Sequence, residues 1–119
     1  MPVRAIRGAI TTEIDGAPEI CRATGELLAR MLEANELRTA DVISLWLTVT
    51  PDLRSEFPAR GARDVGWGDV PMLCAVEMDV PGALPRCIRA MAHVDVADDR
   101  RLTPVYLGRA RELRPDQSR

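Results

Sequence analysis

The sequence predicts a single domain of the α/β class, built on one mixed sheet. From Val42 to Thr50 apolar and polar side chains alternate, as in a strand with one buried face. From Ile20 to Leu32 apolar residues recur at helical spacing. Strand patterns also occur near both ends of the 119-residue chain, which indicates that strands and helices alternate along it. We expect residues 1–119 to form one domain, with about five strands, one long helix and one short helix around a single core.

The N-terminal part predicts a strand followed by the long helix. Val3 to Thr12 reads as a strand with Ile6 and Ile10 on one face and Arg7 on the other. Residues 15–18, Asp-Gly-Ala-Pro, end that strand and begin a helix, because proline is tolerated in a first helical turn. This amphipathic helix is expected to end near residue 35 and to lie on the sheet.

The remaining elements follow in order. The Val42–Thr50 strand is expected to bury Ile43, Leu45, Leu47 and Val49 on one face. The polar segment 53–68 predicts a short helix over residues 59–65. Three more strands are expected, at Val70–Val76, Arg86–Val96 and Val105–Leu113.

Composition argues against several functional classes. The net charge is -2, which gives no electrostatic footprint for nucleic acid although all 16 basic residues are arginines. No apolar run approaches the roughly 20 residues that span a bilayer, and no signal peptide follows Met1, so we expect a cytoplasmic protein without membrane contact.

Cysteine and histidine give no sign of a metal site. The three cysteines form no C-x-x-C pair, and reduced thiols fit them best. His93 is the only histidine and has no acidic or thiol companions in the sequence. We therefore expect neither a metal nor a disulfide framework.

The stretch 71–90 carries the candidate site. It contains Cys74, Glu77 and Arg89 among apolar side chains, where a carboxylate and a guanidinium would each recognise a small ligand strongly. On the pattern alone, interface arginines at Arg7 and Arg89, an exposed turn carboxylate and a buried thiol account for these residues as well. Cys74 and Glu77 are three apart, so a regular strand would turn them to opposite faces.

The sheet is expected to leave one face bare. If the long helix covers one side, the other side carries Val3, Ala5, Ala9, Cys87 and Met91 together with Arg7 and Arg89. That much apolar surface is rarely left in water. Burial against copies of the same chain would cover it, so we predict a homo-oligomer.

Five motifs, in order along the chain, resemble the monofunctional AroH-class chorismate mutases. They are RAIRGAITTE, TPDLRSEFPARGARDVGW, the V-P-x-x-C-x-x-E-M-D-V element from Val70, P-R-C-I-R from Pro85, and the late V-Y-L with L-R-P-D. The resemblance implies a homotrimer whose sheets form a pseudo-α/β barrel, with active sites between subunits. It also implies the cofactor-free conversion of chorismate to prephenate in aromatic amino-acid (Phe/Tyr) biosynthesis.

The resemblance also implies residue roles. Arg89 would donate to the ether oxygen and the enolpyruvyl carboxylate, and Arg7 and Tyr106 would bind that carboxylate. Glu77 would accept a hydrogen bond from the ring hydroxyl, with Cys74 close to the same hydroxyl. The neighbouring subunit would add Phe57, Arg60 and Arg63, and Leu113 and Arg114 would lie near the entrance.

The sequence departs from the family pattern at three places. Position 60 is Arg where Lys is frequent, Pro104 stands where His is frequent, and residues 110–112 are more polar than usual. Two other functions remain open from the sequence. One is a non-catalytic module that binds a small dicarboxylate, and the other is a trimeric deaminase-like enzyme acting on imines or enamines.

Overall fold

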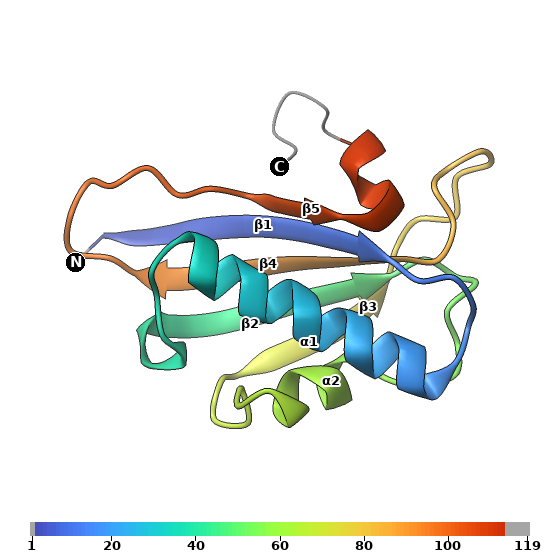
Figure 1. Cartoon of the computed structure of the whole chain (residues 1–119), viewed down its shortest axis with the longest axis horizontal. Helices are drawn as coiled ribbons and strands as arrows, with labels where there is room; N and C mark the ends of the chain where they lie inside the picture. The colour runs from blue at the N-terminus through green and yellow to red at the C-terminus, as the bar shows by residue number, and fades with distance from the viewer. Residues whose placement is uncertain (1, 114–119) are drawn as a thin grey trace.

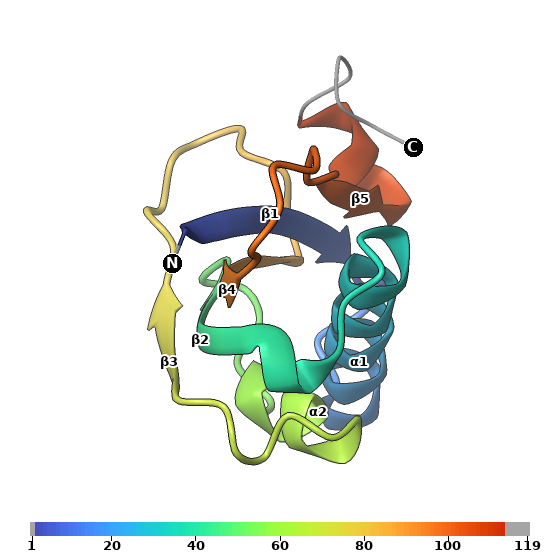
Figure 2. The same ribbon diagram turned by 90° about the vertical axis from the view of Figure 1, so that its left-hand side faces the viewer.

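The computed structural model describes residues 2–113 and shows one five-stranded mixed sheet with both helices on one side. The elements are β1 (Val3–Thr11), α1 (Ala17–Ala34), β2 (Val42–Val49), α2 (Pro58–Asp64), β3 (Met72–Val76), β4 (Cys87–Asp95) and β5 (Val105–Leu107), with 3₁₀ turns η1 (Thr39–Asp41) and η2 (Gly108–Glu112). Figure 1 shows α1 lying across the strands, and Figure 2 shows α1 and α2 on the same side of the sheet. The predicted fold class is confirmed.

The strand order is β3-β2-β4-β1-β5, so the strand that carries Arg89 is at the centre. β4 runs antiparallel to both β1 and β2, whereas β5 pairs parallel with β1 and β3 pairs parallel with β2. A central strand is held by hydrogen bonds on both edges. Side chains on β4 therefore have well-fixed positions.

The core lies between the sheet and the two helices. α1 begins with Pro18 in its first turn and turns its apolar residues, Ile20, Leu27, Leu28 and Met31 among them, onto the sheet, where they are almost fully buried. Gly8 on β1 permits this approach, since a Cβ there would meet Met31 Sδ at 2.7 Å. Trp67, which the sequence patterns did not assign to the core, follows α2 and is part of the core at 1% exposure.

Two sequence predictions were wrong. Ile43 was expected on the buried face, but the pairing of β2 with β4 shifts between Val42 and Ser44, and the shift leaves Ile43 43% exposed. The last strand was expected to reach Leu113, but β5 ends at Leu107. Gly108, with φ of 59°, turns the chain into η2, and the Arg109 N–H donates to Thr11 Oγ1 at 2.9 Å.

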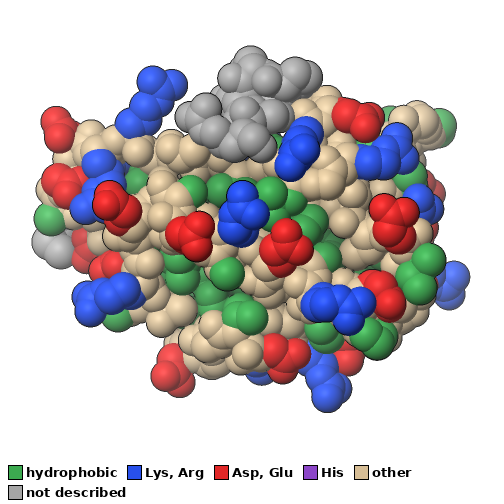
Figure 3. All heavy atoms as spheres, viewed as in Figure 1, with side chains coloured by type: hydrophobic (Ala, Val, Ile, Leu, Met, Phe, Trp, Pro, Cys, Tyr) green, Lys and Arg blue, Asp and Glu red, His purple; other side chains and the backbone are tan. Residues whose placement is uncertain are grey.

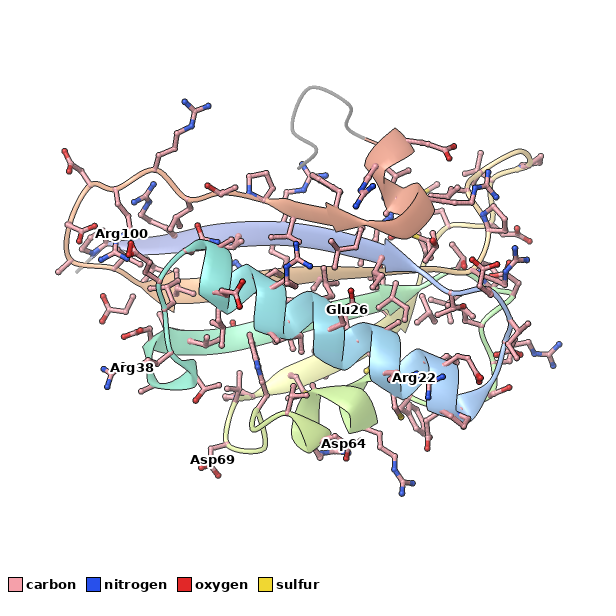
Figure 4. All side chains as sticks on the ribbon, viewed as in Figure 1. Arg22, Glu26, Arg38, Asp64, Asp69 and Arg100 are labelled. Carbon is pink, nitrogen blue, oxygen red and sulfur yellow. The ribbon has the colours of Figure 1, made fainter. Side chains whose placement is uncertain are left out.

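The two faces of the molecule differ in character. Seen from the helix side, the surface is a mixture of acidic and basic side chains (Figure 3), and Arg22, Glu26, Arg38, Asp64 and Asp69 project from it (Figure 4). On the opposite face neither α1 nor α2 covers the sheet, and η2 lies over only one part of it, where Ala110 packs against Ala9, Cys87 and Tyr106. Large apolar residues are exposed there: Val3 (58%), Trp46 (48%), Leu73 (59%) and Met91 (37%).

In the part of the chain that the structure describes, no helix is both long enough and apolar enough to cross a membrane.

Candidate active site

A pocket of about 470 Å³ lies on the uncovered sheet face. Its polar lining comes from Arg7 on β1, Thr48 on β2, Arg89 on β4, Tyr106 on β5 and Glu77 just beyond β3. The apolar lining includes Ala9, Trp46, Met91 and Leu113. Four strands and the residue that follows β3 thus contribute to one site, and five residues proposed from the sequence come together there: Arg7, Glu77, Arg89, Tyr106 and Leu113.

Strand register explains why these side chains converge. Arg89 pairs with Ala9 on one side and with Thr48 on the other, and Ala9 pairs in turn with Tyr106. Paired residues project from the same face of a sheet. The small side chain of Ala9 lies between Arg89 and Tyr106 and therefore leaves room for a ligand.

Glu77 reaches this face because β3 is extended by one hydrogen bond. The N–H of Glu77 donates to the Val49 carbonyl at 2.8 Å, so the residue continues the alternation of the strand. Its Oε2 accepts a hydrogen bond from Thr48 Oγ1 at 3.0 Å and lies 4.0 Å from Arg89 Nε. Glu77 and Arg89 form an ion pair that is not closed by a hydrogen bond.

Two buried donors in the pocket are unsatisfied. Arg89 Nε and Tyr106 Oη have no hydrogen-bond partner among residues 2–113, and Tyr106 is only 3% exposed. A buried polar group without a partner costs about 1–3 kcal/mol, so such groups are few in folded proteins and each requires an explanation. Their position in one pocket indicates a ligand that accepts hydrogen bonds.

Cys87 lies on the same face as Arg89 but does not line the pocket; it is in a small buried cluster with Ala9, Tyr106 and Ala110 of η2. Burial raises the pKa of the Cys87 thiol above its usual value near 9, while the Arg89 guanidinium beside it opposes the change. The thiol is therefore protonated at neutral pH and is not a nucleophile.

A second pocket, of about 450 Å³, lies at the outer edge of β3. It is lined by Cys74 and Val76 of that strand and by the 53–58 segment with Glu56 and Phe57. Phe57 is 71% exposed, although a side chain of this size is usually buried. Cys74 pairs with Leu47, a core residue, and so faces away from the first pocket. From the sequence, Cys74 was expected to lie beside Glu77 at one ligand, and within one chain the two residues do not lie on the same face.

The remaining predicted residues lie near this second pocket or outside the described residues. Arg60 and Arg63 are exposed on α2, and Arg60 pairs with Glu56 at 3.3 Å. The 53–57 segment is tethered by Asp15, whose Oδ1 accepts hydrogen bonds from the backbone N–H groups of Arg54 (2.9 Å) and Ser55 (3.0 Å). Arg114 lies outside residues 2–113.

Sequence reasoning missed Thr48 and Trp46 as pocket residues. The signal was present in the alternation of β2, which places both opposite the buried leucines. Which strand adjoins β4 was not readable from the chain, and this adjacency brings Thr48 beside Arg89. Among residues 2–113, no three His, Cys, Asp or Glu side chains are grouped so as to hold a metal ion.

A sheet face with two arginines, a carboxylate and a buried phenol around one pocket is typical of proteins that bind a small anion at fixed donors. Comparisons with known proteins narrow this class. The family model described as chorismate mutase type I matches residues 3–117. The chain therefore belongs to the chorismate mutase type I family, as the sequence motifs predicted.

Named relatives agree with this assignment. Chorismate mutase AroH of Bacillus subtilis (strain 168) is 45% identical over 121 residues, covering 99% of this chain and 94% of the relative. Chorismate mutase AroH of Thermus thermophilus is 50% identical over 117 residues, covering 96% and 95%. A solved chorismate mutase from Clostridium thermocellum has a TM-score of 0.84 at 45% identity and covers 88% of this chain and 96% of its own.

Proposed function

We propose that the chain catalyses the Claisen rearrangement of chorismate to prephenate in the pocket around Arg89. The observation that carries this proposal is the pair of unsatisfied buried donors, Arg89 Nε and Tyr106 Oη. The exposed side chain of Arg7 lines the same pocket. Chorismate is a dianion with an ether oxygen between its two carboxylate-bearing parts. A site with several fixed donors matches it chemically.

The reaction limits what a protein has to contribute. One ether C–O bond breaks as one C–C bond forms, with no nucleophile and no proton transfer. The enzyme therefore acts by holding the flexible substrate in its compact reactive conformer. It also places positive charge where the ether oxygen becomes negative in the transition state.

We propose the residue roles that the family resemblance implies, and the arrangement of the pocket supports them. Arg89, on the central strand, donates to the ether oxygen and to the enolpyruvyl carboxylate, because its planar guanidinium reaches two acceptors at once. Arg7 and Tyr106, on neighbouring strands, bind the same carboxylate. Glu77, at the opposite end of the pocket wall, accepts a hydrogen bond from the ring hydroxyl. Leu113 packs at the entrance against the Tyr106 cluster.

The site is completed, we propose, by a neighbouring copy in a homotrimer. The uncovered sheet face exposes Val3, Trp46, Leu73 and Met91, which is unfavourable in an isolated chain. The second pocket, with Phe57 and Cys74, lies at the sheet edge, where it can face the first pocket of another subunit. Phe57 would then pack on the substrate, Cys74 would contact it, and Arg60 and Arg63 would supply positive charge at the cleft mouth.

We also propose a cytoplasmic enzyme of phenylalanine and tyrosine biosynthesis. Its three cysteines are free thiols, as a reducing compartment allows. The substrate is the partner that the site requires, and the chemistry requires no cofactor.

The direct test is to incubate the purified chain with chorismate and to follow its loss together with the appearance of acid-labile prephenate. Conversion supports the proposal. Calorimetric binding of chorismate without conversion would favour the non-catalytic binding module. Turnover of an imine or enamine substrate, with none of chorismate, would favour the deaminase-like alternative.

A further inference from the structure

We infer that Thr48 is a positioning residue for the reaction: its hydroxyl holds the Glu77 carboxylate clear of Arg89, so that the guanidinium is open for substrate. Thr48 Oγ1 donates to Glu77 Oε2 at 3.0 Å, and this same oxygen lies 4.0 Å from Arg89 Nε. The inference rests on the roles proposed above for Glu77 and Arg89.

Thr48 is well placed for this task. It lies in β2 between β3 and β4, paired with Ala75 on one side and with Arg89 on the other. As a β-branched residue in a strand, it has few side-chain rotamers, so its hydroxyl has a defined direction. Glu77 is less constrained, because it lies one residue beyond β3 and only its backbone N–H continues the ladder.

Without the Thr48 hydroxyl, the two charged side chains would close on one another. A guanidinium and a carboxylate in a pocket form short, charge-assisted hydrogen bonds when nothing holds them apart. Both are only partly exposed, at 41% for the Arg89 side chain and 31% for Glu77. A closed pair would occupy Arg89 Nε, the donor that is buried and unsatisfied here. Substrate would then have to break that pair.

The hydrogen bond from Thr48 has a second effect on the acceptor. It uses Oε2 of Glu77, while Oε1 accepts a longer hydrogen bond from the Met78 N–H at 3.4 Å, so the carboxylate is fixed in orientation and keeps lone pairs that can accept from a ligand in the pocket. One hydroxyl thus prepares both the acceptor for the ring hydroxyl and the donor for the ether oxygen. Such preparation before binding lowers the cost of ordering the site when substrate arrives.

The test is a double-mutant cycle. Thr48→Val keeps the shape of the side chain but removes the donor, and should lower kcat/KM about ten- to a hundredfold, with a higher KM because substrate competes with the closed ion pair. Thr48→Ser retains the donor and should restore most of the activity. In a Glu77→Ala background, Thr48→Val should cause no further loss beyond about twofold, because nothing remains to be positioned.

A structure of the Thr48→Val protein gives a readout that activity alone does not. Glu77 should approach Arg89 Nε to hydrogen-bonding distance, about 2.7–2.9 Å, in place of 4.0 Å. An unchanged separation would overturn the inference. An equal loss from Thr48→Val in the wild-type and Glu77→Ala backgrounds would also overturn it, since Thr48 would then act on the substrate or on the fold.

The outcomes separate this inference from the proposed site. If Glu77→Ala alone retains full activity, the role proposed for Glu77 fails, and the inference about Thr48 fails with it. If Glu77→Ala loses activity but Thr48→Val does not, only the role of Thr48 fails. If Thr48→Val does not fold, Thr48→Ala is compared with Thr48→Ser on the same cycle, with the same expected contrast.

Discussion

The backbone N–H of Arg86 donates to both carboxylate oxygens of Asp52, at 3.1 and 2.9 Å. Asp52 follows β2, and Arg86 immediately precedes β4, in the left-handed region with φ of 49°. The next N–H, that of Cys87, donates to Thr50 Oγ1 at 2.9 Å. The turn after β2 therefore fixes where β4 begins, and with it the position of Arg89 in the pocket.

Asp52→Ala should weaken both stability and turnover. It removes the acceptor of the Arg86 N–H at a strained backbone position, and because this hydrogen bond is exposed to water the cost should be about 0.5–1.5 kcal/mol in the free energy of unfolding. Urea denaturation and steady-state kinetics measure the two effects. Asp79→Ala, at an exposed residue in the connection from β3 to β4 that also contains Arg86, is the matched control and should change stability by no more than about 0.5 kcal/mol. Equal effects of the two substitutions would show that the hydrogen bonds from Arg86 to Asp52 are unimportant.

Gly61→Ala should separate the two helices. A Cβ at Gly61 would lie 2.5 Å from the Cys21 carbonyl oxygen and 2.9 Å from its Cα, and these backbone atoms cannot rotate away. Alanine gains about 1 kcal/mol in helix propensity, but overpacking costs about 1–3 kcal/mol, so we expect a net loss of stability.

Gly68→Ala is the control for that substitution, because nothing lies within 4 Å of a Cβ there. It should leave the urea midpoint almost unchanged, whereas Gly61→Ala should lower it. A stable Gly61→Ala protein would mean that α1 and α2 can move apart without penalty.

The sequence predicted the elements well where periodicity was strong. The alternation of β2 and the apolar stripe of α1 each follow from one local pattern, and both elements formed as expected. Ile43 and the end of β5 were wrong because they depend on a shift in strand pairing and on a positive-φ glycine, neither of which changes apolar periodicity.

The site was predicted less completely than the fold. Motifs named Arg7, Glu77, Arg89 and Tyr106, and these do converge. The spacing of residues along the sequence could not give the strand order β3-β2-β4-β1-β5. That order determines which residues lie beside Arg89. The strand alternation did warn that Cys74 and Glu77 face opposite ways, and the structure places them in different pockets.

Stability should depend on the Asp15 carboxylate in acid. The Arg54 N–H is the main cause that holds the Asp15 pKa below its usual value near 3.8; burial opposes it, and hydrogen bonds from Ser55 lower the pKa further. A lowered folded-state pKa contributes stability that is fully present above the unfolded value and is lost as pH falls through the folded value.

Asp15→Asn tests that dependence. Wild type should be the more stable protein near neutral pH, and the difference should shrink as pH falls below about 3.8. Urea midpoints at fixed protein concentration measure it, with Glu13→Gln as the exposed neighbouring control. A difference that is constant across pH would mean that the charge of Asp15 does not contribute.

Arg89 should matter more for the transition state than for binding. Replacing it by neutral citrulline keeps the shape of the side chain and should reduce kcat by about a hundredfold or more, the scale for a lost oxyanion donor. KM should change much less, because the ether oxygen carries its charge only in the transition state. Steady-state kinetics on chorismate measures both constants. Equal losses in kcat and in substrate affinity would contradict this role.

Mixed oligomers can test whether one site is shared between copies. Arg89→Gln removes the guanidinium of Arg89 from the first pocket, and Phe57→Ala removes the exposed aromatic side chain of the second pocket. If the pockets face each other across a subunit boundary, a trimer of both variants contains one interface with an intact Arg89 from one chain and an intact Phe57 from the other. Co-refolded variants should then regain activity that neither has alone. Co-refolded protein no more active than the average of its parents would mean that Phe57 acts within its own chain or not at all.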